Sequence, residues 1–177
     1  KVIFMPKFNT MNKRIFLIAL YSISLLQTTT AQYYYKELLS NKQLIADRNT
    51  FKELNTRNIV IHSLEADGQP SKDFFCEKKI NNNFTRIETH SKSNMNGESI
   101  LTTYFTADGL VLKTTDSSDL SASTSTYKYD KNNNVINITS VSHSNDDDFN
   151  TTLTEEHQYF YNDNNQPIKL LRIKNLR

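Results

Sequence analysis

Apolar and polar residues follow two different patterns along the chain, and the change falls near residue 58. Between Lys36 and Leu54 apolar residues recur at roughly helical spacing, although Arg48 interrupts the stripe. From Asn58 onward, short apolar or alternating segments are separated by polar clusters about every 10–15 residues, the pattern of strands joined by short turns. We therefore expect a short helix within residues 32–57, which otherwise read as a linker. Residues 58–177 are expected to form a mainly β domain, an antiparallel meander of hairpin repeats.

Four seven-residue segments resemble one another: Leu64–Pro70, Phe105–Val111, Tyr129–Val135 and Tyr161–Pro167. Each begins with an apolar or aromatic residue and has Asp or Asn at its fourth position and Gly or Asn at its fifth. Gly and Asn adopt positive φ most readily, and a three-residue hairpin loop ends with one residue in that conformation. The segments therefore predict four hairpin turns of one type. The residues that define them are Asp67, Gly68, Asp108, Gly109, Asn132, Asn133, Asn164 and Asn165.

The repeated turn also predicts a strand register. The first residue should face the seventh, which pairs Phe105 with Val111, Tyr129 with Val135, and Tyr161 with Pro167. Tyr127 and Tyr159 would share that face. The residues then left on the opposite face are Leu112, Ile136, Ile138, Ile168 and Leu170. Either both faces are partly covered, as in an open, curled sheet or one with a helix packed on it, or the register is off by one residue.

The hairpin segments resemble a known repeat. Residues Tyr127–Val135, Tyr-Lys-Tyr-Asp-Lys-Asn-Asn-Asn-Val, resemble the tyrosine-aspartate (YD) repeat of bacterial secreted RHS proteins, Tyr-x-Tyr-Asp-x-x-Gly-x-Leu. Tyr159–Pro167 is a second match, in which Asn162 replaces the Asp of the motif; Asn133 and Asn165 replace its Gly. The resemblance implies a secreted protein whose β-hairpin sheets form a shell or surface filament, often labelled carbohydrate-binding. It implies no catalytic residues, because the repeats of that family have none.

Four tyrosines of these two segments are the candidate ligand residues: Tyr127, Tyr129, Tyr159 and Tyr161. On one face of neighbouring hairpins they would form a platform on which sugar rings can stack. Aromatic ladders in sheets also serve as core, with hydroxyls that reach the edge. Both interpretations remain open from the sequence.

The N-terminal region predicts export. A basic start at Met11–Arg14 is followed by an apolar run, Ile15–Leu26, and a small polar stretch that ends at Ala31. This order is typical of a secretory signal peptide over residues 11–31, with residues 1–10 as an extension from a misplaced start. The apolar run is too short to span a bilayer, which needs about 20 residues, so no transmembrane segment is expected after cleavage. The expected location is secreted, periplasmic or on the cell surface. The chain also ends within a predicted strand, which suggests a fragment of a longer protein.

Removal of the signal peptide reverses the sign of the net charge. The whole chain has 21 Lys and Arg against 19 Asp and Glu, a net charge of +2. The first 31 residues contain four of the basic residues and no acidic one, so the remaining chain has 17 against 19, a net charge of −2. Nucleic-acid binding needs clustered Lys and Arg, and no basic stripe is present. We expect no nucleic-acid partner.

Catalytic and metal-binding signatures are weak. Cys76 is the only cysteine, which argues against a disulfide scaffold and favours a buried apolar role. Asp130–Asn134 begins like a calcium loop, but Val135 and Val141 stand where an EF-hand needs Gly and Glu. The three glycines exclude phosphate-binding and nucleophile-elbow motifs. We therefore expect no cofactor, no metal and no enzymatic activity.

The sequence favours a secreted, non-enzymatic surface or interaction protein whose partner is a glycan or another cell-surface protein. One alternative is a structural fragment of a larger RHS-like shell. A weaker alternative is an extracellular hydrolase, supported only by scattered Asp, Glu and His residues.

Overall fold

The computed structural model describes residues 29–93, 97–144 and 151–176, with side chains from Tyr35 to Asn175. It contains one α-helix, α2 (Thr29–Glu53), and a series of β-strands. The strands are β1 (Asn58–Ile61), β2 (Phe74–Ile80), β3 (Arg86–Ser93), β4 (Gly97–Phe105), β5 (Val111–Ser118), β6 (Ser121–Tyr129), β7 (Val135–Ser144), β8 (Thr152–Tyr161) and β9 (Pro167–Leu176).

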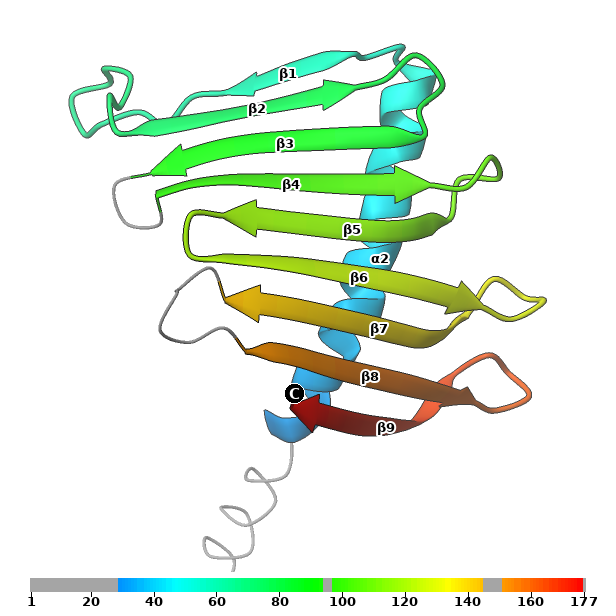
Figure 1. Cartoon of the computed structure of the whole chain (residues 1–177). Coiled ribbons are helices and arrows are strands. Elements are labelled where there is room, and N and C mark those ends of the chain that lie inside the picture. Colours follow the sequence, from blue (N-terminus) through cyan, green and yellow to red (C-terminus); the bar gives the residue numbers. More distant parts are fainter. Residues whose placement is uncertain (1–28, 94–96, 145–150, 177) are drawn as a thin grey trace, which may run out of the picture. The chain divides into compact units, whose positions relative to one another are not determined.

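The strands form one antiparallel sheet in sequence order, β1 to β9, so each strand pairs with its neighbours along the chain (Figure 1). This open nine-stranded meander confirms the predicted fold class. Each strand pairs with the strand that follows it, as expected for apolar segments that short polar turns separate.

The chain divides into two compact units, Lys1–Leu39 and Ser40–Arg177. Of the first unit, the structure describes the start of α2 from Thr29. The predicted signal peptide lies mostly outside the described residues, and its predicted end at Ala31 falls within α2. The second unit contains the remainder of α2 and the whole sheet.

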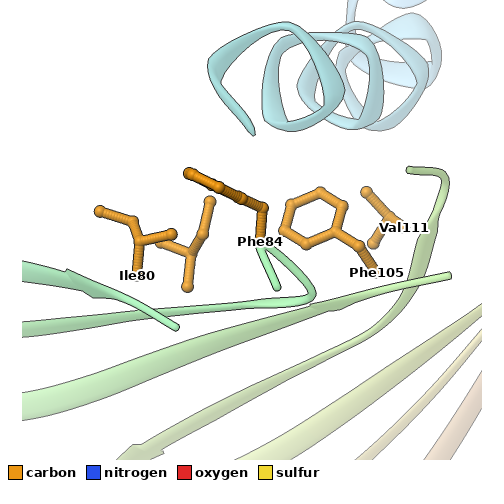
Figure 2. Close-up of a cluster of buried hydrophobic side chains, with 5 residues drawn as sticks. Ile80, Phe84, Phe105 and Val111 are labelled. Atoms are coloured by element: carbon orange, nitrogen blue, oxygen red, sulfur yellow. The ribbon is translucent and has the colours of Figure 1, made fainter. Parts of the chain in front are cut away.

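The predicted helix is present, but it begins earlier than the apolar stripe suggested. It covers Thr29–Glu53, a stretch without Gly or Pro, so nothing in the sequence interrupts it. Within the second unit, Leu44, Ile45 and Phe51 of α2 pack against a cluster of buried apolar side chains on the sheet. The buried members of this cluster are Ile80, Phe84, Ile87, Phe105 and Val111, and Figure 2 shows Phe84, Phe105 and Val111 side by side beneath the helix.

We call the side of the sheet against which Ser40–Glu53 packs the helix face, and the opposite side the open face. Residues paired across neighbouring strands lie on the same face. Ile80 pairs with Ile87, which pairs with Thr103, and the same chain of pairs continues strand by strand to β9, so all of these residues lie on the helix face. No element of the described second unit covers the open face (Figure 1). The sheet is therefore covered on one side by a helix, one of the two arrangements that the sequence had left open.

The four predicted hairpin turns share one backbone structure. In each, the amide after the first residue of the segment donates to the carbonyl four residues later, as from Thr106 N to Leu110 O at 2.8 Å. The same three-residue loop is closed by a second bond, as from Gly109 N to Thr106 O at 3.0 Å. The residue at the fifth position has positive φ in all four turns: Gly68 at 80°, Gly109 at 92°, Asn133 at 62° and Asn165 at 57°. Gly and Asn alternate there because both tolerate this conformation.

The predicted pairs of first and seventh residues are also present. Phe105 faces Val111, Tyr129 faces Val135, and Tyr161 faces Pro167. At the first of the four turns, Leu64 and Pro70 form an isolated bridge. The predicted pairing of the first and seventh residues is therefore correct at the turns.

The predicted face was wrong for two residues, Ile138 and Leu170. Ile138 pairs with Tyr127 and Leu170 pairs with Tyr159, so both lie on the helix face. The cause is a β-bulge that follows each of the three repeated hairpins of the sheet, where the register shifts by one residue. The bulged residues Leu112, Ile136 and Ile168 remain on the open face as expected, and they are 50%, 38% and 64% exposed.

A further turn of related structure connects β2 to β3. Asn81 N donates to Arg86 O, and Asn81 Oδ1 accepts from the amides of Thr85 and Arg86. Here the residue with positive φ is Phe84, at 55°, and its ring is buried beneath the helix. The polar cluster Asn81-Asn82-Asn83 predicted a turn here, but not the positive φ of Phe84, because Phe rarely adopts that conformation.

Candidate functional site

Two of the candidate tyrosines are bound to the sheet itself. Tyr129 Oη donates to Val111 O at 2.9 Å, and Tyr161 Oη donates to Val135 O at 2.7 Å. In both cases the tyrosine ends one strand, and the acceptor begins the neighbouring strand of the preceding hairpin. Tyr129 Oη also accepts a hydrogen bond from Asn41 Nδ2 of α2, at 2.8 Å.

The carbonyl oxygens of Val111 and Val135 are available to the tyrosines because neither residue is paired with the next strand. The ladder between β5 and β6 begins at Lys113, and the ladder between β7 and β8 begins at Asn137. Val111 and Val135 therefore lie beyond the paired residues, on the far side of the bulge. A buried carbonyl without a partner costs free energy, and the tyrosine hydroxyl supplies that partner.

The surroundings of the two hydroxyls raise their pKa values. Burial is the main reason for the raised pKa of Tyr129, and hydrogen bonding with Asn41 opposes it in part. Burial, with a smaller contribution from the negative charge of Asp130, raises the pKa of Tyr161 to about 12. Both phenols therefore remain protonated donors over the whole range in which proteins usually function.

The other two candidate tyrosines lie on the same face. Tyr159 is 5% exposed, and Tyr127 packs at the margin of the apolar cluster under the helix. The structure thus places all four tyrosines on the helix face, where Tyr127 packs against the apolar cluster and Tyr129 accepts a hydrogen bond from Asn41. No element of the described second unit covers the opposite side of the sheet, the open face.

The open face carries a regular row of β-branched side chains, four threonines and one valine. The registered pairs place Thr102, Thr115, Thr124, Val141 and Thr154 opposite one another on five successive strands, β4 to β8. We call these five residues the threonine row. A parallel row, one step nearer the hairpin turns, begins with Tyr104 and Lys113 and continues with Thr126 and Thr139. Thr102 is buried and Val141 has no hydroxyl, so the hydroxyls that these rows present are those of Thr115, Thr124, Thr126, Thr139 and Thr154.

Aromatic rings on the open face are accompanied by cations. Lys113 Nζ lies 4.5 Å from the centre of the Tyr104 ring, and Lys169 Nζ lies 5.1 Å from the centre of the Phe160 ring. Phe160 is 42% exposed. Sequence analysis missed these residues, because the strand face of each aromatic became clear only from the register and the bulges.

The described turn residues serve structural roles. Asp130 Oδ1 accepts from the amides of Asn132 and Asn134, and the Asn134 side chain bonds to its other oxygen. These bonds, chiefly that from the Asn134 side chain, lower the pKa of Asp130. Asn132 and Asn134 also donate to Asn165 Oδ1, which connects one hairpin turn to the next.

Charged side chains gather around one carboxylate on the helix face near β9. Arg172 donates to Glu155 through Nε and Nη2, at 2.5 and 2.9 Å, and Lys174 Nζ lies 3.4 Å from Glu155 Oε2. His157 Nε2 lies 2.6 Å from Glu155 Oε1. Hydrogen bonds from Arg172, followed by the contribution of His157, lower the pKa of Glu155 to about 2 despite some opposition from burial.

No group of three or more His, Cys, Asp or Glu side chains in the described part of the chain is arranged to hold a metal ion. Cys76 is buried and unpaired with another cysteine. Within residues 29–93, 97–144 and 151–176, no helix is both long enough and apolar enough to cross a bilayer.

Comparison with known proteins identifies no relative. No family model, no curated protein and no solved structure matches this chain significantly.

Proposed function

We propose that this protein is a secreted, non-enzymatic interaction protein built from YD-like hairpin repeats, and that it binds a glycan on the open face of its sheet. Export is inferred from the order of basic, apolar and small polar residues at positions 11–31. The interaction role is inferred from the surface that the repeats leave uncovered.

The observation that carries the proposal is the threonine row beside Tyr104 and Lys113. Glycans present hydroxyl groups and weakly apolar ring faces, and a surface of hydroxyls, methyl groups and an aromatic ring offers partners for both. A linear glycan laid across β5 to β8 would meet Thr115, Thr124, Val141 and Thr154 on successive strands, which are spaced about 4.8 Å apart. The four tyrosines would then stabilise the sheet from its other side, the helix face.

The test is a thermal melt of the full chain, alone and with a panel of soluble oligosaccharides. A ligand that binds only the folded state raises the midpoint of unfolding. The proposal expects a shift with at least one sugar, and loss of that shift in Tyr104→Ala. Phe75→Ala provides a matched control, because Phe75 lies on the open face at β2, away from the threonine row, and is 40% exposed.

A cooperative melt that no sugar shifts would contradict glycan binding. Such a result would favour the alternative that the chain is a structural part of a larger hairpin shell. An extracellular hydrolase is the weakest alternative, because the one close His–Glu pair on β8, His157 and Glu155, is bound by Arg172 and Lys174. Hydrolysis of a sugar that disappears in Glu155→Gln would be needed to support it.

A further inference from the structure

One lysine occupies an equivalent position in each of the three repeated hairpins of the sheet. The position belongs to the first cross-strand pair beyond the bulge, and all three pairs lie on the open face: Tyr104 with Lys113, Lys128 with Asn137, and Phe160 with Lys169. Lys128 and Lys169 are exposed, and Lys113 is half-buried. We call Lys113, Lys128 and Lys169 the hairpin lysines.

Each hairpin also presents an aliphatic side chain close to this pair. The bulged residues Leu112, Ile136 and Ile168 lie on the open face and are exposed. Neighbouring hairpins are two strands apart, which corresponds to about 10 Å. The hairpin end of the open face therefore repeats an ammonium group together with an aliphatic surface.

The hairpin lysines form no ion pair with a carboxylate in the part of the chain that the structure describes. Glu156 of β8 lies on the same face, but its carboxylate accepts hydrogen bonds from the side chains of Asn137 and Gln158. Lys128 attracts Glu156 only at longer range, as the last of the causes that lower the pKa of this carboxyl. The three ammonium groups thus keep a positive charge that no described carboxylate contacts.

The open face of β2 to β4, farther from the repeated hairpin turns, is different. There Glu77 lies 3.1 Å from Lys79, and Glu98 lies 2.5 Å from His90. Residues 32–177 as a whole contain 17 Lys and Arg against 19 Asp and Glu, a net charge of −2. The positive charge is therefore a local property of the surface that the hairpin lysines form, and not of the whole chain.

Two of the hairpin lysines lie over aromatic rings, and this affects which sugar can stack there. Lys113 Nζ is 4.5 Å from the centre of the Tyr104 ring, and Lys169 Nζ is 5.1 Å from the centre of the Phe160 ring. A neutral sugar that stacks on such a ring displaces the ammonium group, which then loses its cation–π attraction without compensation. A sugar with a carboxylate offers the displaced ammonium group a new partner of opposite charge.

We propose that the glycan bound on the open face is anionic, a linear polysaccharide of carboxylate-bearing sugars, and that the hairpin lysines select it. Its carboxylates bind the hairpin lysines, and its sugar rings pack on Tyr104, Phe160 and the bulged aliphatic residues. A single exposed ion pair is weak, so selection arises from several pairs made by one polymer. The inference rests on the proposed function and names the chemical class of its ligand.

A single-stranded nucleic acid fits this surface less well. Such a strand stacks successive bases on aromatic side chains and carries a phosphate at every nucleotide. The two rings that accompany hairpin lysines stand on β4 and β8, four strands or about 19 Å apart, so they cannot stack neighbouring bases. Three lysines spread over β5 to β9 also form no continuous track for a phosphate backbone.

The experiment compares a galacturonate oligosaccharide with its full methyl ester, which has the same sugar rings but no charge. Binding to the full chain is measured by calorimetry at low and high salt, in buffer without divalent cations. The acid should bind about fivefold or more tightly than the ester, and this advantage should shrink at high salt, which screens exposed charges.

A triple variant tests the hairpin lysines. Combining Lys113→Gln, Lys128→Gln and Lys169→Gln should remove the preference, so that acid and ester bind within about twofold of each other. The matched control combines Lys42→Gln, Lys52→Gln and Lys72→Gln, two on α2 and one between β1 and β2, and should keep the preference. Thermal melts show whether both variants remain folded, and the comparison of acid with ester in the parent chain depends on neither.

Glu156→Gln provides a test in the opposite direction. Its carboxylate on the open face repels an anionic ligand, so its removal should tighten binding of the acid about twofold and leave binding of the ester unchanged. Equal effects of this variant on acid and ester would contradict the inference.

The outcomes separate this inference from the proposed function. If acid and ester bind equally, or if the control triple variant loses the preference as fully as the hairpin triple variant, the inference falls and glycan binding stands. If neither sugar binds and the wider panel of oligosaccharides shifts no melt, the proposed function fails as well. Binding of an oligothymidylate or of polyglutamate that matches binding of the acid, and that depends on the hairpin lysines, would overturn the inference in favour of another anionic polymer.

Discussion

Tyr161 donates its hydroxyl to the carbonyl oxygen of Val135 in the preceding hairpin, at 2.7 Å. Tyr129 does the same for Val111 one hairpin earlier, at 2.9 Å. The tyrosine at the first position of one repeat therefore completes the hydrogen bonding at the seventh position of the repeat before it. This relationship gives Tyr129 and Tyr161 a structural role that depends on the order of the hairpins.

Removal of one hydroxyl should destabilise the fold. In Tyr161→Phe the ring remains, but the carbonyl of Val135, a residue that is 5% exposed, loses its partner. Leaving such a group unsatisfied costs about 1–3 kcal/mol, so the free energy of unfolding should fall by about that amount in a urea titration.

Tyr104→Phe is the matched control for this prediction. Tyr104 lies on the open face, where its ring contacts Lys113, and its change to Phe should alter the free energy of unfolding by less than about 0.5 kcal/mol. Equal losses in the two variants would show that the hydrogen bond to Val135 is not what stabilises the sheet.

Gly109 should be the least replaceable of the turn glycines. Its φ of +92° resembles that of Gly68 at +80°, yet a Cβ at Gly109 would overlap Arg48 Nη1, whereas one at Gly68 would meet nothing within 4 Å. Arg48 cannot easily withdraw, because it is 4% exposed, donates to Phe84 O and lies over the Phe105 ring. Asn serves at the equivalent position of two other turns, so Gly68→Asn should cost less than about 1 kcal/mol.

Gly109→Asn should instead cost about 2 kcal/mol or more by chemical denaturation, because its side chain overlaps a buried, held guanidinium. A double-mutant cycle with Arg48→Ala measures the overlap directly. The account expects a coupling of at least about 1 kcal/mol, and purely additive effects would contradict it.

Two neighbouring isoleucines of β7 should respond very differently to truncation. Ile138 is 3% exposed on the helix face, and Ile136, the bulged residue, is 38% exposed on the open face. Ile138→Ala should cost about 2–5 kcal/mol, as for a buried side chain, and Ile136→Ala should cost less than about 1 kcal/mol. Similar losses from both, measured by urea unfolding, would mean that the bulge is absent.

The bulges also explain why the sequence did not predict the face of every strand residue. Turn chemistry at residues such as Asp108-Gly109 and Asn132-Asn133 was sufficient to predict the hairpins and their first-to-seventh pairs. The bulge at three of these turns shifts the alternation by one residue, and the apolar pattern alone does not mark it. Ile138 and Leu170 were therefore assigned to the wrong face.

Arg48 illustrates a second limit of prediction from sequence. In the pattern it reads as a break in an apolar stripe, but in the structure its guanidinium caps the carbonyl of Phe84 and packs on the Phe105 ring, which anchors α2 to the sheet. Its partners come from two turns that are distant in sequence. The open-face surface beside Tyr104 was missed for the same reason, because it exists only when five strands are in register.

Acid should destabilise the protein through Glu155. Its pKa is about 2 in the folded state, chiefly because Arg172 donates to it, against an ordinary value of 4.5. A lowered pKa in the folded state contributes stability that is present above pH 4.5 and is lost as the pH falls toward 2. Glu155→Gln should therefore flatten the fall in unfolding free energy over this interval.

Asp163→Asn, which removes a carboxylate from an exposed hairpin turn, serves as the control for the acid experiment. It should leave the pH dependence close to that of the parent chain. If Glu155→Gln and Asp163→Asn behave alike between pH 4.5 and 2, the contacts of Glu155 with Arg172 and Lys174 contribute nothing to stability.

The most direct test of the central claim, that the repeat tyrosines hold the sheet together, is a near-ultraviolet titration of Tyr161, taken as the difference between the parent chain and Tyr161→Phe. Burial raises its pKa to about 12, so the stability it contributes is present below pH 10 and is lost as the pH rises toward 12. The account predicts that this phenol ionises well above pH 10, together with loss of the folded state. Ionisation near pH 10 in a protein that stays folded would mean that the Tyr161 hydroxyl is solvated. That result would contradict the structural role and favour the four tyrosines as ligand residues.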